Sequence, residues 1–228
     1  MHSEVPARLV PGAVVWRRTV LDAGGLSRIL PDGCLDIIWT AGSLFVAGPD
    51  TVARVGRTTP GSFTGLRFAS GVGPAVLGLP AFELTDRRVD LAELWRPARV
   101  REAVERIHDG AEPGAVIEEL AAEHLRRGEG PDPLMRAVAA RLSAGDSVAG
   151  TARAVNLGER HLRRRSLAAF GYGPKVLGRI LRLGRALDLA RDGVPYAQVA
   201  AATGYTDQAH LSREVKALAG APLGVVLA

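Results

Sequence analysis

The hydrophobic pattern has a period of two in the front of the chain and a period of 3.6 behind it. Up to about residue 88, short apolar runs alternate with turn-forming clusters such as Pro31-Asp32-Gly33, a pattern typical of short strands. Ala41-Gly42-Ser43, between two such runs, predicts a hairpin. The runs cover 13–16, 35–39, 44–47 and 65–68. Their length and spacing predict a small barrel or sandwich.

From Asp90 onward the apolar positions recur at helical spacing. Leu91, Leu94 and Trp95 can share one helix face, and similar stripes follow until about residue 125. We therefore predict an α+β chain with a β-rich, barrel or cupin-like domain over 1–89, a helical connector over 90–145 and an all-α domain over 146–228. The connector is expected to hold plain packing helices, with a dimerisation face as the alternative.

The last third of the chain contains one short pattern twice. His161-Leu162-x-Arg164 and His210-Leu211-x-Arg213 are offset by 49 residues, and each is followed by a glycine at the same distance. Each copy follows an Ala-rich stretch and a turn, Asn156-Leu157-Gly158 or Thr203-Gly204-Tyr205, whose Asn and Gly tolerate positive φ. This repeat predicts two helix-turn-helix units in tandem, which together read DNA.

The second helix of the first unit, predicted over 159–170, carries an outward stripe. Asp146 or Ser147 is the predicted cap of the preceding helix. The stripe has the spacing i, i+3, i+4 and i+7, and its arginines suit guanine edges or phosphates in a major groove. A solvated basic face is the alternative. The stripe consists of Arg160, Arg163, Arg164 and Leu167.

The second unit has a more polar and less charged helix, predicted over 207–217 with Thr206 as its cap. Asp207 is expected to support the helix dipole or to orient Arg213. A contact in the DNA groove and a helix-packing role are equally consistent with the position of His210. A helix over 175–191 spans about 25 Å and would hold the two recognition helices about 34 Å apart. The predicted DNA contacts here are Gln208, His210, Ser212, Arg213 and Lys216.

The charge distribution agrees with this division. Residues 147–228 hold 12 Lys and Arg against 5 Asp and Glu, whereas residues 1–146 hold 17 against 19. The positive excess therefore lies with the repeat, as a polyanion partner requires. The single cysteine, Cys34, excludes an internal disulfide and a cysteine zinc cluster, and we predict no metal or cofactor. Without a long apolar run or a signal peptide, we expect a cytoplasmic protein with no membrane partner.

At this point the chain resembles the AraC/XylS family of bacterial transcription regulators. The resemblance covers residues about 147–228. It implies that the arginine stripe of the first unit faces one major groove and that Gln208, Ser212 and Arg213 face the next. Ser166 and Val215 stand where the family usually has Phe. The segments that carry it are Val155-Asn156-Leu157-Gly158-Glu159-Arg160-His161-Leu162-Arg163-Arg164, Gly204-Tyr205-Thr206-Asp207-Gln208-Ala209-His210-Leu211-Ser212-Arg213 and Gly220-Ala221-Pro222.

The front half resembles a little-characterised domain that precedes such units, often in actinobacteria. The residues that carry this likeness include Leu30-Pro31-Asp32-Gly33-Cys34-Leu35-Asp36-Ile37-Ile38-Trp39. By analogy with sugar-sensing regulators, we predict an effector pocket with Trp39 as an apolar wall. The alternative is structural: Cys34 is a buried hydrophobe, and Asp36 pairs with Arg28 or Arg67. The predicted ligand-binding residues are Arg28, Cys34, Asp36, Trp39 and Arg67.

Other classes of function are less well supported by the sequence. A redox sensor would depend on Cys34 alone, with no adjacent base. No phosphate loop, catalytic carboxylate pair or metalloprotease motif is present, so we predict a regulator rather than an enzyme. Double-stranded DNA is the predicted partner. A small-molecule effector, RNA polymerase and a second copy of the chain remain open as further partners, as does a front domain that only dimerises.

Overall fold

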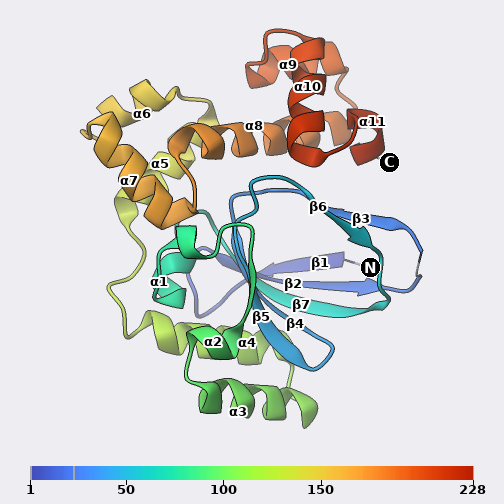
Figure 1. The fold of residues 1–228 in the computed structure, drawn as a ribbon, viewed down its shortest axis with the longest axis vertical. Coiled ribbons are helices and arrows are strands. Elements are labelled where there is room, and N and C mark those ends of the chain that lie inside the picture. Colours follow the sequence, from blue (N-terminus) through green and yellow to red (C-terminus); the bar gives the residue numbers. More distant parts are fainter. Residues whose placement is uncertain (1, 23, 228) are drawn as a thin grey trace.

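In the computed structural model, residues 2–22 and 24–227 are described, and they begin with a six-stranded antiparallel sheet (Figure 1). Its order is β1-β2-β7-β4-β5-β8. The predicted hairpin at Ala41-Gly42 is confirmed, with both residues at positive φ between β4 and β5. The strands are β1 His2–Pro6, β2 Ala13–Val20, β4 Leu35–Thr40, β5 Ser43–Ala47, β7 Gly61–Phe68 and β8 Arg88–Asp90.

One face of this sheet is covered by helices. Alternate residues such as Val15, Ile37 and Leu66 are buried in an apolar core together with Val116 and Ile117 of α4. Because side chains alternate across a strand, the residues between them point to the other face. The covering elements are α1 Gly73–Leu77, the 3-10 helix η1 Ala81–Glu83, α2 Leu91–Leu94, α3 Pro97–His108 and α4 Pro113–Leu125.

The opposite face of the sheet looks toward a two-stranded ribbon and toward the C-terminal helices (Figure 1). The ribbon pairs β3 Leu26–Ile29 with β6 Arg54–Arg57. On this face Trp16 lies over Gly65, its neighbour on β7, where an added Cβ would be 2.4 Å from the indole. Gly65 therefore leaves the space that the Trp16 ring occupies.

The C-terminal domain is all helical and has two cores. The first contains Met135 of α5, Leu162 and Phe170, and the second contains Leu187 and Leu211. Together with the β-rich front, this confirms the predicted α+β class. The helices are α5 Pro133–Ala144, α6 Val148–Ala154, α7 Glu159–Phe170, α8 Pro174–Arg191, α9 Tyr196–Thr203, α10 Gln208–Ala219 and α11 Leu223–Leu227.

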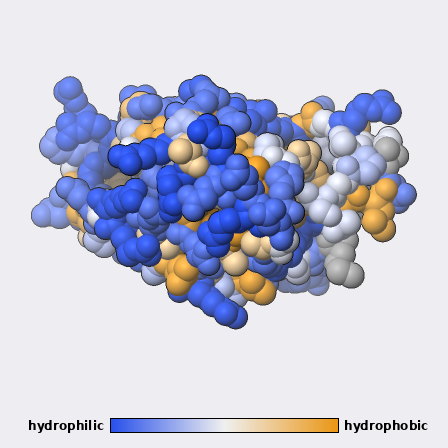
Figure 2. All heavy atoms as spheres, turned by 90° about the horizontal axis from the view of Figure 1, so that it is seen from below, coloured by the Kyte–Doolittle hydropathy of each residue, from blue (hydrophilic) through white to orange (hydrophobic). Residues whose placement is uncertain are grey.

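The predicted connector over 90–145 is divided between the two domains. Helices α2–α4 pack into the core of the sheet, whereas α5 packs into the first core of the C-terminal domain. The outer side of α3 is charged: Arg99 pairs with Glu123 of α4 at 2.7 Å, and Arg106 pairs with Glu119 at 2.7 Å. Figure 2, the view onto this end of the molecule, shows a mostly hydrophilic surface with scattered hydrophobic residues. Helices α2–α4 therefore pack on the sheet with their inner side and carry a charged outer side.

Among the described helices, none is both long enough and apolar enough to cross a membrane.

Candidate DNA interface and ligand cavity

The first helix-turn-helix unit consists of α6 and α7. The Ser147 hydroxyl accepts a hydrogen bond from the backbone N–H of Gly150 at 3.0 Å and caps α6, as predicted. Asn156 turns the chain with a φ of 52°. Gly158 is the N-cap of α7 and has an ordinary φ of −67° without a side-chain cap, so Asn156 alone provides the left-handed turn.

The second unit consists of α9 and α10, joined through Gly204 at a φ of 79°. The Asp207 carboxylate accepts a hydrogen bond from the backbone N–H of His210 at 2.6 Å. Asp207 is therefore the N-cap of α10, and the prediction of Thr206 for that position was wrong. A carboxylate at this position also interacts favourably with the helix dipole.

The arginine stripe of α7 is free to bind DNA. Arg160, Arg163 and Arg164 are exposed, and across 2–22 and 24–227 none of them has an ion pair or hydrogen bond. Leu167 beside them is half-buried, while Leu162 and Phe170 on the opposite face are buried. Guanidinium groups are suited to phosphates and guanine edges, so the stripe stays a predicted DNA contact.

The corresponding face of α10 is also exposed, but it is polar rather than densely charged. Gln208, Ser212, Arg213 and Lys216 are exposed. His210 differs: it is half-buried, its ring lies edge-on to Tyr205 at 5.3 Å, and its Nδ1 accepts from the N–H of Thr206 at 3.3 Å. In this structure His210 therefore stabilises the turn before α10.

Both recognition helices contact the front domain with their C-terminal ends. The Thr85 hydroxyl donates to the carbonyl of Gly171, just after α7, at 3.0 Å. At the end of α10, the backbone N–H of Ala53 donates to the Leu218 carbonyl at 2.7 Å, and Arg28 Nε donates to the Ala219 carbonyl at 2.6 Å. The N-terminal ends of α7 and α10 therefore point away from the front domain (Figure 1), and in helix-turn-helix proteins these ends reach the bases.

A cavity of about 1360 Å³ lies between the open face of the sheet, the ribbon and α8. Its apolar walls come from the sheet and from α8, and charged side chains stand among them. Apolar walls with charged groups among them are typical of a small-molecule site, and this space is larger than the about 300–1,000 Å³ of most such sites. Its walls include Trp16, Ile38, Phe45, Ile180, Leu183 and Leu187.

A buried polar group lies at one end of this cavity. Trp16 Nε1 donates to Asp36 Oδ1 at 2.6 Å, and Arg67 Nε donates to the same oxygen at 3.2 Å. Burial raises the pKa of Asp36 to about 6, and Arg67 opposes this shift. Arg67 also lies 3.5 Å from Asp32 and 3.6 Å from Glu4. Together with Asp36, its guanidinium group therefore pairs with three carboxylates. This cluster can take up or release a proton at Asp36, or bind a polar ligand.

The structure brings three of the five predicted ligand residues to the cavity: Cys34, Asp36 and Arg67. Trp39 lies on the opposite face of the sheet, 5.5 Å from the His108 ring, because positions three apart on a strand face opposite ways. Arg28 binds the end of α10 instead, so Asp36 pairs with Arg67. Burial raises the pKa of the Cys34 thiol well above its usual value, and Asp32 adds to the effect, so the reactive thiolate is disfavoured.

Sequence reasoning missed Trp16 and the part of the cavity formed by α8. Trp16 follows Val15 in a strand of alternating pattern, and the alternation alone places it on the face opposite the apolar core. The contribution of Leu183 and Leu187 from α8 was not visible, because it depends on how two domains pack together.

Comparison with known proteins gives matches for both halves of the chain. Residues 151–228 match a family described as a helix-turn-helix domain, and residues 13–90 match a domain of unknown function, DUF6597. No curated protein matches the chain.

Several solved structures resemble the fold. An apo ToxT variant from Vibrio cholerae strain SCE256 is 11% identical, with a TM-score of 0.50 over 95% of this chain and 97% of its own. Wild-type ToxT from the same strain, with a bound unsaturated fatty acid, is 11% identical, with a TM-score of 0.48 over 94% of each chain. A probable AraC family transcriptional regulator from Rhodopseudomonas palustris CGA009 is 18% identical, with a TM-score of 0.37 over 42% of this chain and 95% of its own.

Proposed function

We propose that this chain reads a bipartite DNA site under the control of a small molecule. The chain joins a DUF6597 domain to an AraC-type helix-turn-helix domain and is a DNA-binding transcription regulator. The observation that carries the proposal is the arrangement of α7 and α10. Within the described residues, the outward polar side chains of both helices have no ion pair, and both helices have their N-terminal ends on the side away from the front domain. Two such helices suit successive major grooves on one face of a duplex.

Selection of bound sequences from a random DNA pool, at physiological salt, tests the reading of two half-sites. We expect a motif with half-sites about 10 bp apart. A doubled motif would indicate that two copies of the chain bind together. A single half-site would contradict the bipartite reading, and a pool without enrichment, with and without added metabolites, would contradict the regulator itself.

The cavity between the sheet and α8 supports control by an effector. Its ligand would touch the sheet on one side and Leu181 or Gly184 of α8 on the other. Because α8 joins the two helix-turn-helix units, binding energy in this cavity is coupled to the placement of the units. We propose that Asp36 and Arg67 make the polar contacts with the ligand. The protein would then act by binding its ligand and DNA, without catalysing a reaction.

Filling the cavity from α8 tests this effector site. Gly184 lines the cavity, and an added Cβ would meet nothing within 4 Å, so Gly184→Phe adds a ring without changing charge. Compounds that raise the thermal midpoint of the wild type should not raise that of Gly184→Phe. The matched control is Ala115→Phe, on the exposed side of α4. Equal shifts in all three proteins would contradict binding in this cavity.

A further inference from the structure

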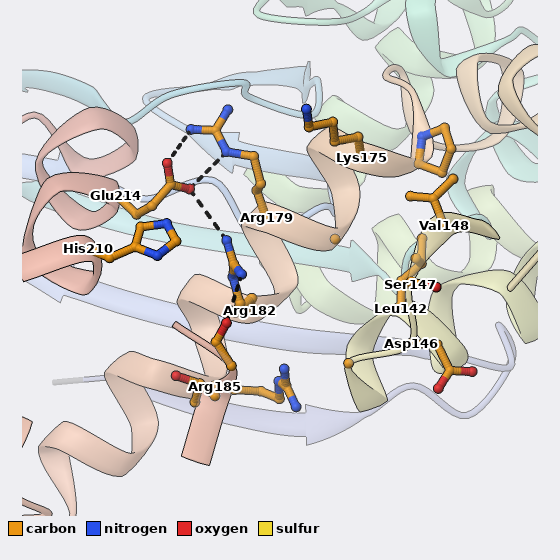
Figure 3. Close-up of a pocket in the computed structure, with 15 residues that line it drawn as sticks. Leu142, Asp146, Ser147, Val148, Lys175, Arg179, Arg182, Arg185, His210 and Glu214 are labelled. Atoms are coloured by element: carbon orange, nitrogen blue, oxygen red, sulfur yellow. Dashed lines mark hydrogen bonds and ion pairs between the residues drawn. The ribbon is translucent and has the colours of Figure 1, made fainter. Parts of the chain in front are cut away.

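A second cavity, of about 570 Å³, lies between the two helix-turn-helix units on the far side of α8 from the ligand cavity. Four basic side chains of α8 line it at helical spacing, and α10 closes one end (Figure 3). We call it the basic groove and define it by Lys175, Arg179, Arg182, Arg185, Asp146 and Glu214.

The charges in the basic groove are only partly compensated. Glu214 accepts from Arg179 Nε at 2.9 Å and lies 3.8 Å from Arg182 Nη2, as the dashed lines in Figure 3 mark. Asp146 is paired at 2.7 Å with Arg141, outside the groove. Among the residues that the structure describes, Lys175 has no ion pair and Arg185 Nε has no hydrogen-bond partner. Arg185 Nε is buried, whereas Lys175 is exposed, so the groove retains positive charge and an accessible ammonium donor.

Two side chains of the basic groove, Arg179 and Arg182, are held in place. Arg182 lies over the Tyr205 ring at 4.2 Å and donates to the Gly204 carbonyl at 3.3 Å. The Arg179 ion pair with Glu214 is bidentate, with a second contact of 3.1 Å. Fixed guanidinium groups lose little freedom on binding an anion, so such a site is pre-organised.

The basic groove also faces the side from which DNA would approach. Apart from Arg185, which lines both spaces, the α8 residues of the ligand cavity and of the basic groove lie on opposite faces of the helix, and the front domain occupies the ligand-cavity face. The C-terminal ends of both recognition helices contact that domain, so their N-terminal ends and the basic groove share the other side. A duplex bound by both units would pass over α8 between its two major-groove contacts.

We propose that the basic groove binds the DNA backbone between the two half-sites, with Lys175 and Arg185 contacting phosphates beside the intervening minor groove. The proposal rests on DNA binding by the two units. A narrow minor groove has an enhanced negative potential that attracts arginine, so base pairs that no side chain touches would influence affinity through their shape. Spacer sequence would then be read without base contacts.

Salt dependence of DNA binding by the full chain tests this proposal. On a mixed-sequence duplex of about three helical turns, Lys175→Gln should make the slope of log K against log salt shallower by about one unit. Between about 50 and 200 mM salt, that change amounts to a three- to fourfold difference. Lys175→Gln/Arg185→Gln should change the slope by about two units. The control, Arg101→Gln, removes the same charge from the exposed side of α3 and should leave the slope unchanged.

A second measurement locates the contact. On the duplex selected from the random pool, neutral methylphosphonate linkages in the spacer should abolish the difference between the wild type and Lys175→Gln, whereas the same linkages outside the half-sites should not. Equal slopes for Lys175→Gln and Arg101→Gln would overturn the proposal while leaving DNA binding intact. Stabilisation of the wild type alone by inorganic phosphate, together with equal slopes, would overturn it in favour of a small-anion site. A wild type that binds no DNA would instead overturn the proposed function.

Discussion

The two helix-turn-helix units share one backbone plan and differ in chemistry. Helix α7 presents Arg160, Arg163 and Arg164, whereas the corresponding face of α10 presents Gln208, Ser212 and a single arginine, Arg213. Charge attracts any duplex, while amide and hydroxyl groups discriminate between bases. We therefore expect the first unit to contribute mainly affinity and the second mainly selectivity, although both fold from the same repeat.

The strongest test of this difference removes the stripe of α7. The change of Arg160, Arg163 and Arg164 to Ala should weaken binding to every duplex about 100-fold at physiological salt, because three phosphate contacts are lost. Anisotropy titrations on specific and mixed-sequence duplexes measure this. The control changes the exposed Arg96, Arg101 and Arg126 to Ala. A loss confined to the specific duplex would mean that the stripe reads bases and would remove the contrast between the units.

A smaller effect is expected from Gln208→Ala in the second unit. Binding to the selected duplex should weaken by about 1–3 kcal/mol, while binding to mixed sequence and the salt slope stay unchanged, because no charge is lost. Selection from a random pool should show relaxed preference in one half-site. Equal weakening on all sequences would place Gln208 on a phosphate, and the second unit would then resemble the first.

The interiors of the units differ at one matched position. Ser166 of α7 and Val215 of α10 occupy the same place in the repeat, and both are fully buried. In the described part of the chain, Ser166 Oγ has no hydrogen-bond partner. Ser166→Ala removes this unsatisfied hydroxyl and should raise the free energy of unfolding by about 1 kcal/mol, measured in denaturant. A loss of stability would show that the hydroxyl has a hydrogen-bond partner and contributes to the core of the first unit.

The smallest effect concerns the helix caps. Asp207 caps α10, whereas Gly158 at the start of α7 provides no side-chain cap. Gly158→Ser should stabilise by a few tenths of a kcal/mol, because the φ is ordinary and an added Cβ meets nothing within 4 Å. Asp207→Ala should destabilise by about 1 kcal/mol. Thermal midpoints compare the two, and a destabilising Gly158→Ser would show that α7 begins differently from α10.

Local chemistry made the DNA-reading units predictable. Asn156, Gly204 and the cap Ser147 act within a few residues of their own position, so composition and spacing were enough to place both units. The cap of α10 was misplaced by one residue, since Thr206 and Asp207 are both capable of the role.

Contacts between distant segments were less predictable. The hydrogen bond of Trp16 to Asp36 depends on β7 lying between β2 and β4, an order that no local pattern specifies. The face of Trp39, in contrast, follows from strand alternation and was open to prediction. The sequence could not show that α8 lines two cavities, because this depends on how both domains pack together.

The two-sided role of α8 constrains how such a protein can evolve. One residue inserted into this helix would turn everything beyond it by about 100° and advance it by about 1.5 Å. The second unit would lose its register on the duplex, and the α8 residues after the insertion would be turned away from their places on the ligand-cavity wall and in the basic groove. Under the proposed function, operator spacing and effector preference are inherited together, and we expect new specificities in this scaffold to arise by substitution along α8 rather than by changes in its length.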